Sequence, residues 1–161
     1  EEYAISTSPV DGLTLSASYY DINAYGDGIK TEEQLEEGGA YGVTYAYGNA
    51  TIGYGKSFKA PETTTATRTA GATTVEYYEN TGISIGYAVN DDLSVSYTSE
   101  DSERSFQTSA TTAYDISMDS VQIAYSLGGA TLSIARADYD NVGYTNGIDT
   151  TETIIAMSFA F

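Results

Sequence analysis

Residues 41–54 read YGVTYAYGNATIGY, and this stretch indicates the fold of the chain. Large side chains alternate with Gly, Thr and Ala from Tyr41 to Tyr47, and again from Ala50 to Tyr54. A period of two places successive side chains on opposite faces of a β-strand. The Gly-Asn pair between the two runs is typical of a tight hairpin turn. The stretch therefore predicts an antiparallel hairpin with one apolar face and one small, hydroxylated face.

The same alternation recurs along the whole chain. Tyr3 and Ile5 begin it, and further runs lie at 13–19, 83–87, 93–97, 121–127, 130–134 and 155–161. Together with the two runs of the first hairpin, these predict nine strands. No helical period competes with them over a comparable length.

The predicted connections are of two alternating kinds. Short turns built from Gly, Asn, Asp and Pro fall at 9–12, 48–49, 89–92 and 128–129. Long polar loops fall at about 21–38, 59–73, 99–117 and 137–150. Short and long connections in strict alternation predict an all-β, up-and-down antiparallel sheet with every long loop at one end.

Composition excludes several classes of function. The 161 residues carry 23 acidic and 6 basic side chains, for a net charge of −17, and include no Cys and no His. Disulfides, thiolate or imidazole metal sites and His-activated nucleophiles are therefore impossible, and we expect neither an enzyme nor a cofactor. The negative charge repels phosphate backbones, so we also expect no nucleic-acid partner.

An alternating sheet can belong to a soluble acidic β-sandwich or to a transmembrane β-barrel. Three features favour the barrel. No charge interrupts the alternating windows, the opposite face is small and polar, and aromatic side chains recur at both ends of the windows. The aromatic positions are Tyr47, Tyr87, Tyr125 and Phe159 near the short turns, and Tyr19, Tyr41, Tyr54 and Tyr97 toward the long loops.

The C-terminal segment 153–161, TIIAMSFAF, carries a family resemblance. Its alternating Ile155, Met157, Phe159 and terminal Phe161 resemble the closing-strand signal of Gram-negative outer-membrane barrels. With the Tyr-Gly hairpins and acidic loops, the chain is similar to the C-terminal half of a general diffusion porin. The resemblance implies a 16-stranded barrel, a homotrimer in the outer membrane, passage of small hydrophilic solutes and ions, and recognition by the barrel-assembly machinery.

Nine is an odd number of strands, whereas bacterial single-chain barrels have an even number with both ends in the periplasm. We therefore expect residues 1–161 to be the C-terminal portion of one barrel domain, supplying strands eight to sixteen, with Glu1 on the extracellular side. The rival interpretation is a complete eight-stranded barrel in which residues 1–8 form a tail.

Strand parity predicts which side chains line the pore. These positions are polar and mostly small, apart from three carboxylates near the outer mouth that either attract cations or belong to a solvated rim. The predicted pore-lining residues are Thr14, Ser16, Ser18, Thr44, Thr51, Glu76, Ser84, Ser94, Ser96, Glu100, Gln122, Thr131, Ser133 and Glu152.

Two further predictions concern the outer leaflet and the loops. Lys56 and Arg136 fall on the outward parity and could pair with phosphates of lipid A in lipopolysaccharide or with carboxylates of a neighbouring subunit. Acidic clusters at 32–37 and 138–141 could bind divalent cations weakly. An alternative function remains open, in which the acidic loops of a surface β-protein act as an adhesin, structural element or phage receptor.

Overall fold

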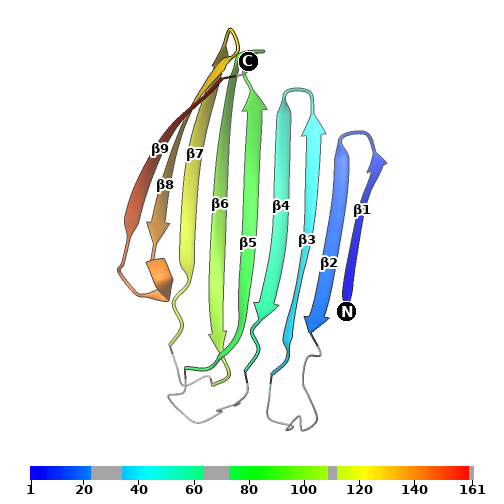
Figure 1. The fold of residues 1–161 in the computed structure, drawn as a ribbon, viewed down its shortest axis with the longest axis vertical. Coiled ribbons are helices and arrows are strands. Elements are labelled where there is room, and N and C mark those ends of the chain that lie inside the picture. The colour runs from blue at the N-terminus through cyan, green and yellow to red at the C-terminus, as the bar shows by residue number, and fades with distance from the viewer. Residues whose placement is uncertain (23–33, 64–72, 109–111, 160–161) are drawn as a thin grey trace.

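The chain forms a single antiparallel sheet of nine strands in sequential order, β1 to β9 (Figure 1). The computed structural model describes residues 1–22, 34–63, 73–108 and 112–159. Every neighbouring pair of strands is antiparallel, which confirms the predicted up-and-down topology. The strands are β1 Glu2–Val10, β2 Leu13–Ile22, β3 Glu36–Tyr47, β4 Ala50–Ala60, β5 Val75–Ala88, β6 Leu93–Phe106, β7 Ile116–Leu127, β8 Ala130–Asp140 and β9 Thr150–Phe159.

Strand β1 separates the two interpretations of the N-terminal residues. It pairs with β2 from Glu2 opposite Tyr20 to Val10 opposite Leu13. Residues 1–8 are therefore part of the sheet and do not form a tail, which confirms nine strands. The predicted turn at 9–12 is shorter than expected, since β1 extends to Val10 and the register shifts between Thr7 and Val10.

Several strands run further toward the long-loop end than the sequence predicted. The predicted loop at 99–117 is wrong at both ends, because β6 continues to Phe106 and β7 begins at Ile116. Ser99 lies opposite Asp119 and Asp101 opposite Ser117 in this added region. The outer face is polar there, and β6 itself is polar on both faces from Ser99 to Ser105, so its apolar alternation disappears although the backbone pairing continues. Hydropathy marks where the outer face is apolar and does not mark where a strand ends.

The two ends of the sheet differ as predicted. The four short turns lie together at the end drawn uppermost in Figure 1, where the C-terminus also lies. Phe159 pairs with Ala130, directly after the turn at 128–129, which fixes the C-terminal side. Glu1 lies at the opposite end, where a one-turn 3₁₀ helix, η1 (Val142–Tyr144), connects β8 to β9. No helix in the described ranges is both long and apolar enough to cross a membrane.

The described sheet is one layer thick and has almost no core. Ala60, at 8% exposure, is the one buried apolar residue among the residues described. Large apolar side chains on one face stay open, including Ile52 at 50%, Ile123 at 47% and Ile155 at 68% exposure. A β-sandwich would cover such a face with a second sheet, and the described ranges contain no second sheet.

The apolar side chains form a band that crosses the strands obliquely. Direct cross-strand pairing defines a row on the apolar face that reads Leu15, Val43, Tyr54, Ile83, Ser99, Asp119, Asp138 and Thr151. Its first four members are apolar or aromatic and its last four are polar. A band that leaves a row of hydrogen-bonded neighbours in this way requires strands tilted relative to the band, as in transmembrane barrels.

The first turn generates a prediction about stability. Gly12 has φ of +76°, and a Cβ built on it would lie 2.2 Å from the Ala46 carbonyl oxygen. We expect Gly12→Ala in the full-length protein to lower the free energy of unfolding by about 1–3 kcal/mol, since the left-handed conformation and the backbone contact are both unfavourable. Urea titration in detergent micelles measures this loss.

Gly86→Ala is the matched control. Gly86 lies in β5, and no atom lies within 4 Å of a Cβ built on it. We expect this variant to match or slightly exceed the wild type in stability. Equal effects of the two substitutions would contradict the account of the Gly12 turn.

Candidate functional site

Most of the predicted pore-lining residues lie on one face of the sheet, which we call the inner face. Residues directly opposite each other in an antiparallel pair point to the same side. One continuous row of such pairs crosses eight strands and reads Thr14, Thr44, Gly53, Ser84, Thr98, Ser120, Ala137 and Glu152. Thr14, Thr44, Ser84 and Glu152 of the predicted set are therefore brought onto a common surface.

A second row places further predicted residues on the same face. It reads Ser6, Ser16, Gly42, Gly55, Gly82, Glu100, Met118, Tyr139 and Thr150. Pairing also assigns the remaining members: Ser18 lies opposite Ala40, Thr51 opposite Gly86, Ser94 opposite Ala124, Ser96 opposite Gln122, Ser133 opposite Ala156 and Thr131 opposite Ser158.

Glu76 is the exception among the predicted lining residues. Tyr77 lies opposite Ser105, but Val75 lies opposite Phe106, so the register of β5 shifts around Glu76. The shift interrupts the period of two at this point. Parity counted along the sequence therefore does not assign Glu76 to the inner face, because a bulge leaves no hydropathy signal in a polar strand end.

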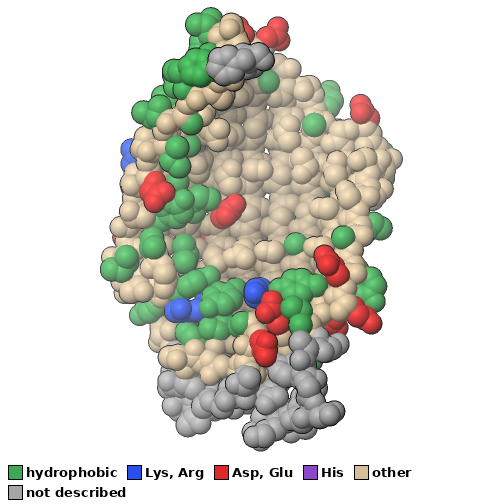
Figure 2. All heavy atoms as spheres, viewed as in Figure 1, with side chains coloured by type: hydrophobic (Ala, Val, Ile, Leu, Met, Phe, Trp, Pro, Cys, Tyr) green, Lys and Arg blue, Asp and Glu red, His purple; other side chains and the backbone are tan. Residues whose placement is uncertain are grey.

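The inner face is hollow and its floor is made of small polar residues. A hollow of about 550 Å³ lies over β2 to β6 and is lined by Ser16, Thr44, Gly53, Gly82, Ser84 and Glu100, among others. Figure 2 looks into this face, where tan, the colour of the backbone and of uncharged polar side chains, covers most of the centre and hydrophobic side chains in green lie mainly toward the margins. A wall of this kind offers hydroxyl and backbone groups to water without closing around any one ligand.

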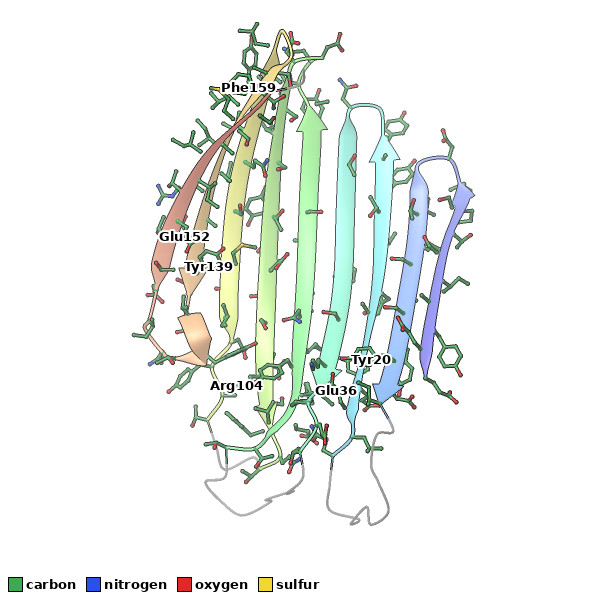
Figure 3. All side chains as sticks on the ribbon, viewed as in Figure 1. Tyr20, Glu36, Arg104, Tyr139, Glu152 and Phe159 are labelled. Atoms are coloured by element: carbon green, nitrogen blue, oxygen red, sulfur yellow. The ribbon has the colours of Figure 1, made fainter. Side chains whose placement is uncertain are left out.

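Two carboxylates lie on this otherwise mostly neutral inner face. Glu100 on β6 lies opposite Gly82 and Met118, and a Cβ on Gly82 would meet the Glu100 Cγ at 3.3 Å. Glu152 lies on β9 opposite Ala137 (Figure 3). Glu100 lines the hollow, and both carboxylates contribute negative potential to the inner face.

A polar cluster joins β2, β3 and β4 at the long-loop end of the inner face. The Tyr20 hydroxyl donates to Glu36 Oε1 over 3.3 Å, and Lys59 Nζ forms an ion pair with the same oxygen at 3.1 Å. Figure 3 labels Tyr20 and Glu36 at neighbouring strand ends. Lys59 lies opposite Gly38, which places it on the inner face.

A second cluster at the same end, which we call the Tyr144 cluster, consists of Tyr78, Ser102, Arg104, Phe106 and Tyr144. The Arg104 guanidinium carbon lies 4.6 Å from the centre of the Tyr144 ring and 4.9 Å from that of Phe106. Tyr78 and Tyr144 have ring centres 5.6 Å apart. The η1 turn thus reaches from β8 across β7 to β6 and β5.

A chain of hydrogen bonds extends the Tyr144 cluster across the inner face. Ser102 Oγ donates to Asn80 Oδ1 over 2.5 Å, so the Tyr144 hydroxyl donates to Ser102 Oγ over 2.6 Å. Asn80 Nδ2 in turn donates to Ser57 Oγ over 3.2 Å. This group is not among the residues predicted from the sequence. Continuing the even parity of β5 and β6 beyond the apolar windows would have placed Asn80, Ser102 and Arg104 inward, but no sequence signal points to Tyr144.

Both predicted lipid-facing cations lie on the opposite, outer face and have partners within the chain. Lys56 Nζ lies 2.6 Å from Glu79 Oε1, and Arg136 Nη2 lies 3.2 Å from Asp138 Oδ1. The Arg136 side chain is 64% exposed and that of Lys56 is 31% exposed. A phosphate would have to share either cation with its carboxylate, and Arg136 is the more accessible.

Tyrosine hydroxyls on the outer face donate to carboxylates toward the long-loop end. Tyr19 donates to Glu37 Oε2 over 2.9 Å, and Tyr97 donates to Asp119 Oδ1 over 2.5 Å. Their rings lie at the edge of the apolar band while their hydroxyls lie in its acidic margin. Such amphipathic placement is typical of aromatic side chains at a membrane–water interface.

The predicted assembly signal lies on the last strand. Ile155, Met157 and Phe159 are 68%, 59% and 59% exposed on the outer face of β9. Phe159 lies at the short-turn end of that strand (Figure 3). Phe161 lies outside the described residues.

The acidic loop clusters do not form a metal site among the residues described. Asp140 accepts a hydrogen bond from Ser117, and Asp149 accepts one from the Asn141 backbone N–H. No group of three or more carboxylates converges within the described ranges. Glu32 and Glu33 of the first cluster lie outside them.

Comparison with known proteins identifies the fold. No protein-family model and no curated protein sequence matches the chain. Among solved structures, the chain is similar to one described as a porin refined at 1.8 Å resolution, with a TM-score of 0.67 and 17% sequence identity. The similarity covers 98% of this chain and 50% of the porin chain, so the chain spans half the length of that porin. The chain therefore has the all-β, up-and-down antiparallel fold of half a porin barrel.

Proposed function

We propose that this chain forms part of the wall of a water-filled channel for passive diffusion of small hydrophilic solutes and ions across a Gram-negative outer membrane. One observation carries the proposal: a single sheet exposes an apolar band on its outer face and a hollow, hydroxylated wall on its inner face. Water suits the inner face, whereas hydrocarbon suits the outer one.

The backbone supports the same proposal. Within hydrocarbon, every N–H and C=O must be bonded inside the protein, so a sheet spans a membrane only when it is closed. In the described structure β1 and β9 each pair on one side only. Seven further strands would close a 16-stranded barrel, in which this chain supplies strands eight to sixteen of one domain. The similarity to half of a porin supports this arrangement.

The polarity of the inner face bears on which solutes pass. Hydroxyl groups of Thr and Ser hydrogen-bond to water and to uncharged solutes without preferring one. Glu100, opposite Gly82, and Glu152, opposite Ala137, add negative charge to this face. We therefore propose a broad channel with a preference for cations, which performs no chemical step.

Several partners stay predictions that follow from the resemblance. These are a homotrimer, the barrel-assembly machinery acting on the segment that ends in Phe161, and lipopolysaccharide at the outer leaflet. Arg136 is the preferred lipid A contact because its guanidinium is the more exposed of the two outer cations. Weak divalent binding at the acidic loops also stays a prediction.

Planar-bilayer recording of the full-length protein tests the proposed channel. We expect stepwise, ohmic increases in current, because a channel with a hydroxylated wall stays filled with water and ions. A folded protein that inserts and gives no current would contradict the channel. That result would favour the alternative of an outer-membrane adhesin, structural protein or phage receptor.

A pair of adjacent carboxylates tests the role of the inner face. We expect Glu100→Gln to lower the ratio of cation to anion permeability roughly two-fold, because it removes a charge that faces the lumen. Reversal potentials in a salt gradient measure this ratio.

Asp101→Asn provides the control on the same strand. Asp101 lies on the outer face, opposite Thr81 and Ser117, and the substitution removes the same charge one residue away. We expect its permeability ratio to stay close to that of the wild type. Equal shifts for both variants would show that bulk charge, rather than the facing of Glu100, sets selectivity.

A further inference from the structure

The connection between β8 and β9, residues 141–149, is folded onto itself by its own hydrogen bonds. Asn141 anchors it: its backbone N–H donates to Asp149 Oδ1 over 3.1 Å, and its Oδ1 accepts from the Gly147 N–H over 3.0 Å. The Val142 N–H also donates to the Ile148 carbonyl over 2.7 Å. These bonds give the segment a fixed shape.

The segment is also fastened to the inner wall, two and three strands away from β8. Tyr144 contacts Arg104 and Ser102 on β6 and Tyr78 on β5. Arg104 Nη2 donates to the Tyr144 carbonyl oxygen over 3.3 Å. Ser102 shares a face with Glu100, so these contacts lie on the side of the hollow. The segment therefore covers part of the inner face at the long-loop end.

The backbone of Tyr144 indicates that these contacts determine its position. Tyr144 has φ of +57°, a left-handed conformation that is uncommon for a large side chain. Such a conformation persists where the surrounding contacts hold it in place. Here one side chain makes a hydrogen bond, a cation–π contact and an aromatic contact, and its carbonyl accepts a further hydrogen bond.

We propose that residues 141–149 form a fixed inward partition at the outer mouth, and that Tyr144 holds it against β5 and β6 and thereby limits the size of solutes that pass. The size limit rests on the proposed channel function, whereas the attachment of the partition does not. Loss of the Tyr144 side chain frees the segment from the wall and widens the mouth.

Thiol labelling tests the attachment without any need for conduction. The protein has no cysteine, so Ser102→Cys introduces a single thiol beneath Tyr144. In detergent-solubilised full-length protein, we expect a bulky maleimide to modify this thiol about ten-fold faster when Tyr144→Gly is added, the order expected for loss of a desolvated cation–π contact. Glycine also accepts the left-handed conformation without strain.

Glu100→Cys is the control for labelling. Glu100 lies two residues away on the same face and is exposed, and none of the hydrogen bonds and ring contacts described for the Tyr144 cluster involves it. Its thiol should react at the same rate with and without Tyr144→Gly. Equal rates for Ser102→Cys in the two backgrounds would overturn the attachment.

Liposome swelling with sugars of increasing size tests the size limit. We expect Tyr144→Gly to raise the uptake of a trisaccharide relative to a pentose about two-fold or more, with Tyr144→Phe between it and the wild type because the ring remains. Val142→Ala, in the same turn and outside the Tyr144 cluster, should behave as the wild type.

The outcomes separate the two proposals. Faster labelling with unchanged sugar ratios would overturn the size limit and leave the attachment standing. No swelling by any variant, including the wild type, would overturn the channel itself. Unchanged labelling together with unchanged ratios would overturn the partition while the channel stands.

Discussion

Hydrogen bonds between the backbones of neighbouring strands hold this structure together. With Ala60 as the one buried apolar residue among those described, side-chain packing supplies almost no core. Eight antiparallel ladders hold the nine strands instead. Because the ladders use only backbone groups, the inner face tolerates Gly42, Gly55 and Gly82 in one row. A soluble domain of this size would lose its core with such residues, whereas here they keep the hollow open.

Because neither face packs into a core, the polarity of the side chains on each face matches the surroundings of that face. The apolar band crosses rows of paired residues obliquely, so Ile83 and Asp119 belong to one row although one is apolar and the other charged. Because the strands are tilted, one row of paired residues lies inside the apolar band on β2 to β5 and outside it on β6 to β9. Carboxylates such as Asp119 and Asp138 therefore lie where tilt and strand length take residues beyond the band, and Tyr97 donates to Asp119 at that boundary.

This division explains what could be predicted from sequence. The number of strands, their order and the facing of residues such as Ser16 and Ser84 follow from a local period of two, which every paired strand must obey. The facing of Glu76 could not be predicted, because a register shift is a relation between two strands and leaves no pattern in either one. The extension of β6 to Phe106 was not predicted because β6 is polar on both faces from Ser99 to Ser105. The contacts of Tyr144 could not be predicted, because its partners lie on the far side of β7 and no local sequence pattern encodes a contact over that separation.

Arg104 contacts aromatic rings, although the charge of the chain would lead one to expect a carboxylate partner. The chain has 23 carboxylates, yet among the described residues none forms an ion pair with Arg104, whose guanidinium lies against two aromatic rings. An exposed ion pair weakens as salt screens it. Ring contacts also bury the flat surface of the guanidinium, and that part of the interaction does not depend on salt. Lys59, by contrast, forms a partly exposed ion pair with Glu36 and has no aromatic ring contact among the residues described. A contact at the long-loop end of the inner face that must hold through changes of ionic strength is therefore better made by Arg104 and Tyr144 than by another of the many available carboxylates.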